Sequence, residues 1–135
     1  MSNKLYPQAK LKLTSGQIDL SSDTLKLALV KNTYSYSAAH ATLADLGSHV
    51  LGSEALTGVA LAVSGEHVVL SADNVRFEGL EAGNTCRAVV LFKDTGTAST
   101  SPLIAIYDTG MGLPFVTSGS PQIIEWSATD KVLKW

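Results

Sequence analysis

Two Asp-Thr-Gly triplets, Asp94-Thr95-Gly96 and Asp108-Thr109-Gly110, are the residues of this chain most suggestive of chemistry. The same triplet is the signature of the catalytic loop of aspartic proteases, in which two carboxylates share one proton. Only Thr97–Tyr107 separates the triplets here, enough for one loop and one strand, whereas such proteases take their aspartates from two large lobes or two identical chains. We therefore interpret both triplets as turns of a hairpin ladder, since turns favour Asp and Gly. An aspartic-type protease is kept as a remote alternative.

The other candidate catalytic and metal-ligating residues do not form a recognisable site. His40, His49 and His67 fall at no spacing typical of metal ligands. Ser118 lacks the Gly-x-Ser-x-Gly turn of a hydrolase nucleophile, and Gly110-Met111-Gly112 does not open a helix that could bind phosphate. We expect no enzymatic activity, no catalytic residue, no cofactor and no metal.

Aromatic residues are the candidates for binding a partner. Large rings supply much of the binding energy at protein interfaces, and on this ground we select Tyr6, Tyr34, Tyr36 and Trp135 as contact residues. An alternative for Trp135 is that it closes the core at the end of the last strand. The sequence does not decide between these two roles.

Composition narrows the class of protein. A length of 135 residues predicts one domain, spanning 1–135, that is large enough for a core. The net charge is −2 and the ten basic residues are scattered, so we expect no nucleic-acid partner.

No apolar run approaches the ~20 residues of a membrane span, and no secretory leader is evident at the amino terminus. The mean hydropathy is positive, at +0.18, which favours some apolar surface being covered by a partner. Cys86 is the single cysteine, and we expect it to be a small buried residue.

Two short helices are expected early in the chain. The first covers Tyr6–Ser15, because Pro7 suits a first helical turn and Gly16 suits the position after the end. The alternation in Lys10-Leu11-Lys12-Leu13 leaves a strand as the alternative. Residues 1–16 then form an arm or a docking helix, separable from the strands. The second helix begins at Ser37 and continues to about Leu46.

The rest of the chain reads as strands separated by turns rich in Gly, Ser and Asp. Ser64-Gly65 has the character of a two-residue hairpin turn, and we expect the last two strands to pair with each other. The fold class is therefore mainly β, an antiparallel β-sandwich or barrel of seven or eight strands with one or two short helices near the amino terminus. The expected strands are Thr24–Val30, Val59–Val63, Glu66–Leu70, Val75–Phe77, Thr85–Lys93 (the most apolar and central), Leu103–Tyr107, Gln122–Ser127 and Lys131–Trp135.

Several segments taken together carry a family resemblance. They are Lys4–Pro7, Ser15–Leu20 running into Thr24–Val30, Tyr34–His40, Ala55–Gly58 and Leu91–Ala105. In this order they resemble a family of small virion structural proteins of tailed bacteriophages, over nearly the whole chain. No catalytic residue comes with the resemblance. It also implies that the Asp-Thr-Gly triplets are turn elements shared by members of the family.

The resemblance implies a protein that is made in the cytoplasm of a host bacterium and located in the virion. It implies a capsid decoration (cement) protein that binds the lattice of the major capsid protein and stabilises the head. The alternative is a neck, tail or fibre component. The expected partners are the major capsid protein or other virion proteins, together with further copies of this chain in a dimer or trimer.

Overall fold

The computed structural model describes residues 4–108, 112–126 and 131–134. It is mainly β, as predicted, with one α-helix, α1 (Pro7–Thr14), near the amino terminus. Three single-turn 3₁₀ helices are η1 (Leu43–Asp45), η2 (Gly47–His49) and η3 (Ala98–Thr100). The strands are β1 (Lys4–Leu5), β2 (Leu25–Lys31), β3 (Val50–Ala55), β4 (Ala60–Ser64), β5 (His67–Ser71), β6 (Val75–Phe77), β7 (Thr85–Lys93), β8 (Leu103–Tyr107), β9 (Phe115–Val116), β10 (Gln122–Ile124) and β11 (Leu133–Lys134).

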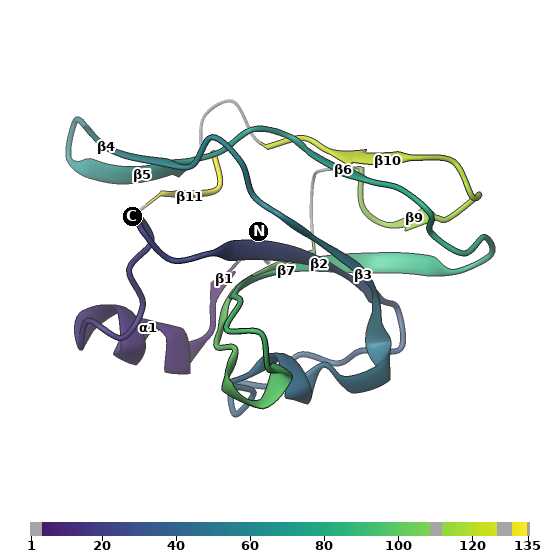
Figure 1. The fold of residues 1–135 in the computed structure, drawn as a ribbon, viewed down its shortest axis with the longest axis horizontal. Helices are drawn as coiled ribbons and strands as arrows, with labels where there is room; N and C mark the ends of the chain where they lie inside the picture. Colours follow the sequence, from purple (N-terminus) through teal and green to yellow (C-terminus); the bar gives the residue numbers. More distant parts are fainter. Residues whose placement is uncertain (1–3, 109–111, 127–130, 135) are drawn as a thin grey trace.

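The strands form one large sheet and two small ones. The large sheet has the order β1-β8-β7-β2-β3, and β9 adds to β7 as a sixth strand. A two-stranded sheet, β10-β6, and a three-stranded sheet, β11-β5-β4, make a second layer over one face of the large sheet (Figure 1). Helix α1 and the 3₁₀ helices η1 to η3 lie on its other face (Figure 1). Every pairing between these strands is antiparallel.

Strand β7 is central and spans the residues predicted for it. It pairs with β2 on one side and with β8 and β9 on the other. Alternate side chains point to opposite faces of a strand, so Val89 and Leu91 join the core under the small sheets. Val90 and Phe92 join a second core against α1 and the tyrosines that follow β2. Residues 88–92 form an unbroken apolar run, because both faces of the strand are buried there.

The predicted helix over Ser37–Leu46 is wrong. The backbone there forms tertiary hydrogen bonds instead: the N–H of Leu43 donates to the carbonyl of Ser101 (2.8 Å), and the carbonyl of Ala41 accepts from the N–H of Leu103 (2.9 Å). The Asp45 carboxylate also accepts the N–H groups of Ala41 (2.7 Å) and Thr42 (3.0 Å). These bonds satisfy groups that an α-helix would have used internally, leaving only the single turns η1 and η2.

Three strands, β1, β3 and β9, were not predicted, so the described part of the chain has eleven strands rather than seven or eight. The expected pairing of the last two strands is wrong: β10 pairs with β6 and β11 with β5. The hairpin turn is displaced by one residue from Ser64-Gly65. Ser64 pairs with His67, so the turn residues are Gly65 and Glu66, and Gly65 has the positive φ (61°) that this turn needs.

The amino-terminal segment lies on the large sheet. Helix α1 begins at Pro7, and Gly16 follows it with a φ of 80°, as the sequence predicts. Strand β1 pairs with β8, and the N–H of Tyr6 donates to the carbonyl of Ile104 at 3.0 Å. The choice of Tyr6 as a contact residue needs correction, because its side chain is wholly buried where the chain turns from β1 into α1. A partner cannot touch it directly.

Candidate interaction surface

The structure brings together three of the four aromatic residues selected from the sequence. The hydroxyl oxygens of Tyr6 and Tyr34 lie 2.9 Å apart, and the ring centroids of Tyr6 and Tyr36 lie 5.2 Å apart. Tyr34 and Tyr36 are half-buried, so part of each residue is exposed to solvent. We call these three residues the aromatic cluster. Trp135 lies outside the described residues.

Two backbone contacts hold the loop that carries Tyr34 and Tyr36. The N–H of Asn32 donates to the carbonyl of Thr85 at 3.1 Å, which ties the end of β2 to β7. The N–H of Tyr34 donates to the carbonyl of Lys31 at 3.1 Å and closes a tight turn. The turn directs the Tyr34 ring back over the second core, where Tyr34 and Tyr36 both pack.

Two histidines lie against the aromatic cluster, and sequence reasoning missed this role. The Nδ1 atom of His40 lies 2.7 Å from the Tyr34 hydroxyl oxygen, and the His49 ring centroid lies 5.9 Å from that of Tyr34. His49 Nδ1 also lies 2.8 Å from the Thr33 hydroxyl oxygen. These aromatic and imidazole residues all fall between positions 33 and 49, but the sequence does not indicate which of them meet. Within the described ranges no group of three or more His, Cys, Asp or Glu side chains could hold a metal.

Burial sets the protonation of this hydrogen-bonded chain. Burial raises the pKa of Tyr6 far above its ordinary value, and the hydrogen bond to Tyr34 adds to the rise. Burial also raises the pKa of Tyr34. Both phenols therefore keep their protons, and the Tyr34 hydroxyl group shares one hydrogen bond with the Tyr6 hydroxyl group and another with Nδ1 of His40. The ring of Tyr36 is fixed from outside by Lys4, whose Nζ lies 3.9 Å from the ring centroid as a cation–π contact.

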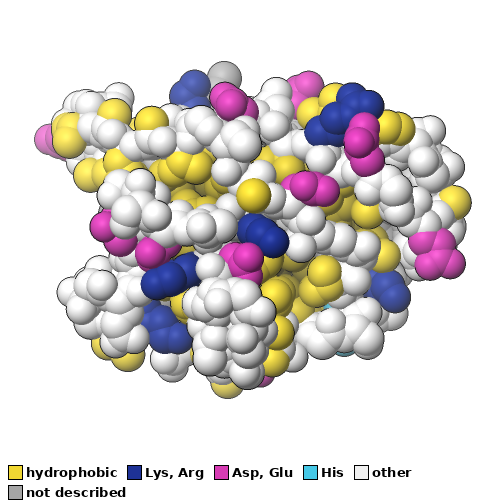
Figure 2. Space-filling view, in the orientation of Figure 1, with side chains coloured by type: hydrophobic (Ala, Val, Ile, Leu, Met, Phe, Trp, Pro, Cys, Tyr) yellow, Lys and Arg dark blue, Asp and Glu magenta, His cyan; other side chains and the backbone are white. Residues whose placement is uncertain are grey.

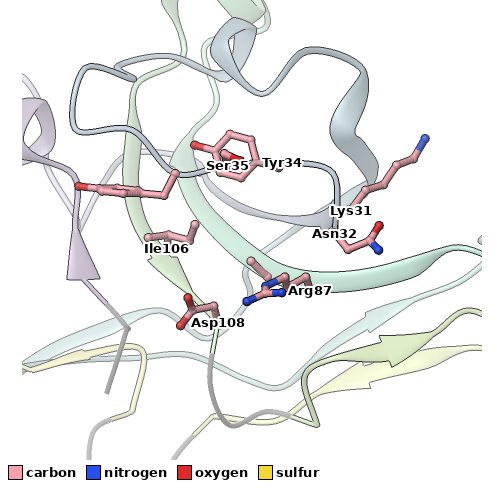
Figure 3. Close-up of a pocket in the computed structure, with 9 residues that line it drawn as sticks. Lys31, Asn32, Tyr34, Ser35, Arg87, Ile106 and Asp108 are labelled. Carbon is pink, nitrogen blue, oxygen red and sulfur yellow. The ribbon is translucent and has the colours of Figure 1, made fainter.

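A polar pocket of about 330 Å³ opens beside the aromatic cluster. Tyr34 and Ser35 lie on one side of it, and Arg87 and Asp108 lie on the opposite side (Figure 3). The Arg87 and Asp108 side chains lie beside an aliphatic floor from β7 and β8, whereas the ammonium group of Lys31 points away from the pocket (Figure 3). The lining residues are Lys31, Asn32, Tyr34, Ser35, Tyr36, Arg87, Ala88, Ile106 and Asp108.

The aspartates of the two triplets lie at opposite ends of the β7–β8 pair. Asp94 belongs to the β7–β8 connection, where its carboxylate accepts the Gly96 N–H (3.0 Å) and pairs with Lys26 Nζ (3.2 Å). These contacts, the Gly96 hydrogen bond first, lower the pKa of Asp94. Asp108 follows the other end of β8, where Tyr107 pairs with Val89. Roughly six strand residues, about 20 Å, separate the two aspartates, so they cannot share a proton within one chain. The first triplet is the turn predicted for it; Thr109 and Gly110 lie outside the described residues.

Comparison of the chain with models of known protein families and with curated proteins finds no match. Among the described helices, none has the length and apolar character needed to cross a membrane. The surface geometry described above is therefore the observation on which a functional proposal can be built.

Proposed function

We propose that the chain is a structural protein of a tailed-bacteriophage virion and that it decorates the head by binding the lattice of the major capsid protein. One structural observation carries the proposal. Tyr34 and Tyr36 are half-exposed aromatic rings, fixed from below by the buried Tyr6, at the rim of a pocket that contains Arg87. The sequence resemblance to small virion proteins supplies the class of partner.

The composition of this surface suits protein recognition. Tyr and Arg are enriched among the residues that dominate interface energetics. Side chains already held in place lose little conformational entropy when a partner binds, and the contacts of Tyr6 and Lys4 hold Tyr34 and Tyr36 in this way. Arg87 and Asp108 lie on the same side of the pocket, and the ammonium group of Lys31 points away from them (Figure 3). Arg87 is therefore the cation of the pocket that an acidic side chain of the capsid protein would contact.

The three-layer fold supports a structural role as well. Both faces of the large sheet are covered, one by the small sheets and the other by α1 and the 3₁₀ helices. Such a domain presents a fixed outer surface to a repeating lattice. Many copies acting together then provide the strength of attachment, even where each single contact is weak.

Binding to expanded capsids that lack this protein tests the proposal. Arg87→Glu reverses a charge in the pocket and should weaken binding by about 30-fold, the loss typical of a central interface residue. Arg76→Glu is the matched control, because Arg76 is an exposed arginine on β6, in the other layer of the fold. Equal binding by the wild type and Arg87→Glu would overturn the role of this surface.

The copy number in purified virions separates decoration from the alternatives. Decoration predicts an amount comparable to that of the major capsid protein, since an icosahedral lattice repeats its binding site many times. A neck, tail or fibre part predicts only a few copies for every hundred of the capsid protein. Gel densitometry of purified virions measures this ratio, and the low value would replace decoration with one of those parts.

A further inference from the structure

The β4–β5 hairpin projects from the edge of the upper layer (Figure 1). All five residues of β4 are exposed. β4 is the edge strand of the β11-β5-β4 sheet, so β5 pairs with one side of it and no described strand pairs with the other. An unpaired edge presents a row of N–H and C=O groups to any strand that approaches.

The other described sheet edges are protected in the ways that proteins commonly use. Very short strands and charged side chains both discourage pairing at an edge. Five of these strands, β1, β6, β9, β10 and β11, have only two or three residues. β3 has six residues but carries Glu54 and lies against β6. β4 is different, because Ala60-Leu61-Ala62-Val63-Ser64 is five residues long and has no charge.

The register shows which backbone groups of β4 face the open side. Ser64 and His67 flank the two-residue turn, and the residues that flank such a turn form a hydrogen-bonded pair. Opposed residues alternate along an antiparallel ladder between bonded and non-bonded pairs. The N–H and C=O groups of Val63 and Leu61 therefore point away from β5, toward the open edge.

The apolar side chains of the hairpin extend beyond the core that covers its base. Leu61 is paired with Leu70 and Val63 with Val68, and cross-strand partners share a face. Leu70 is wholly buried, whereas Leu61 is 39% exposed and Val63 is 78% exposed. Figure 2 shows hydrophobic side chains along this projecting part, at the upper left of the molecule. Exposed apolar side chains gathered beside an unpaired edge are the kind of surface that a protein contact covers.

We propose that β4 pairs antiparallel with β4 of a second copy of this chain about a two-fold axis, joining the two three-stranded sheets into one. An isologous contact needs a self-complementary surface, and an uncharged strand meets its own copy without placing like charges opposite each other. Leu61 and Val63 of one copy then lie beside Leu61 and Val63 of the other. Among the described edges only β4 combines this length with the absence of charge, which favours a second copy as the occupant.

The contact is small and its strength follows from its size. A five-residue strand is about 17 Å long, so the pairing buries less than the ~800 Å² per partner of a standard interface. We expect a weak dimer in dilute solution, strengthened where many copies are held close together. The inference does not depend on the proposed capsid binding, since it concerns the isolated protein.

Sedimentation velocity from micromolar to millimolar concentration tests this pairing. The wild type should shift from monomer toward dimer as the concentration rises. Val63→Pro should remain monomeric, because it removes an N–H that faces the open edge while leaving the bonds to β5 in place. Val63→Ala keeps that N–H and should still associate, although more weakly. Ile123→Lys, which changes an exposed apolar residue of β10, is the control and should behave as the wild type.

A second variant keeps the test decisive if Val63→Pro lowers the thermal stability of the hairpin. Val63→Lys leaves the backbone intact and places like charges close together in the proposed dimer, so it should also remain monomeric. A wild type that is monomeric at millimolar concentration would overturn the inference. So would a Val63→Lys variant that dimerises as the wild type does. Loss of capsid binding by Val63→Lys with self-association unchanged would assign the edge to the capsid protein instead.

Discussion

The hydroxyl groups of Tyr6 and Tyr34, 28 positions apart in the sequence, meet at 2.9 Å beneath the surface of the domain. Tyr6 is wholly buried and Tyr34 is half-buried. The pair joins the amino-terminal segment to the loop after β2 and so supports the proposed contact surface. Disrupting this pair should therefore lower the stability of the whole domain.

Replacing Tyr6 tests how firmly the amino-terminal segment belongs to the core. Tyr6→Ala should lower the free energy of unfolding by about 3–5 kcal/mol, the usual cost of deleting a large buried ring. Tyr6→Phe should cost about 1 kcal/mol, because it removes only the hydrogen bond to Tyr34. Leu11→Ala, at an exposed position of α1, is the control and should change little. Urea denaturation measures all three; a Tyr6→Ala loss as small as that of Leu11→Ala would indicate a separable arm.

A glycine after β3 should be sensitive to substitution for two separable reasons. Gly58 has a φ of 64°, and a Cβ added there would lie 2.7 Å from the Asp73 carboxylate oxygens. Gly65 has a similar φ of 61° with no atom within 4 Å of such a Cβ. Both alanine variants incur about 1–2 kcal/mol for the left-handed backbone, but only Gly58→Ala adds the clash. Thermal unfolding should therefore show the larger loss for Gly58→Ala, and equal losses would mean that Asp73 moves aside freely.

The single cysteine should be inert in the folded protein. Cys86 is wholly buried, and burial raises the pKa of its thiol to about 11. Because the thiolate is the reactive form, we expect almost no labelling by a disulfide reagent at pH 7 to 8. Complete labelling should follow unfolding in guanidinium chloride. Rapid labelling of the native protein would contradict this burial.

The turn at η1 should lose stability in acid. The hydrogen bonds that Asp45 accepts from the N–H groups of Ala41 and Thr42 lower the pKa of its carboxyl group below its ordinary value near 3.8. The folded state thus favours the charged form, so the stabilisation is fully present above the unfolded pKa and disappears as pH falls through the lower folded pKa.

Thermal unfolding from pH 7 to pH 2 measures this effect. Asp45→Ala should cost about 1 kcal/mol at pH 5 to 7, as loss of a capping side chain does. The difference from the wild type should shrink below about pH 4, where the carboxyl group becomes protonated. Glu125→Ala, at an exposed carboxylate, is the control. A cost for Asp45→Ala that is constant down to pH 2 would show that the charge contributes nothing.

Local sequence determined the elements whose signals are contained within a few residues. β7 and β8 match the predicted Thr85–Lys93 and Leu103–Tyr107, because both are short apolar runs, rich in β-branched and aromatic residues and bounded by turn residues, which is the pattern of a buried strand. Helix α1 follows from Pro7 and Gly16, which act through their own backbone preferences. The burial of Cys86 was predictable in the same way, since its strand is mostly apolar.

Tertiary structure decided whatever depended on a distant partner. β3 is a strand because it pairs with β2, although its own sequence contains Gly52 and little periodicity. The helix expected over Ser37–Leu46 did not form because its backbone bonds to the β7–β8 connection. Tyr6 was chosen as a residue that contacts a partner, but its side chain is buried. The hydrogen bond between His40 and Tyr34 was not predicted. These contacts arise only when the loop after β2 packs on the sheet, and a single sequence carries no signal for which distant groups will satisfy its backbone and side chains.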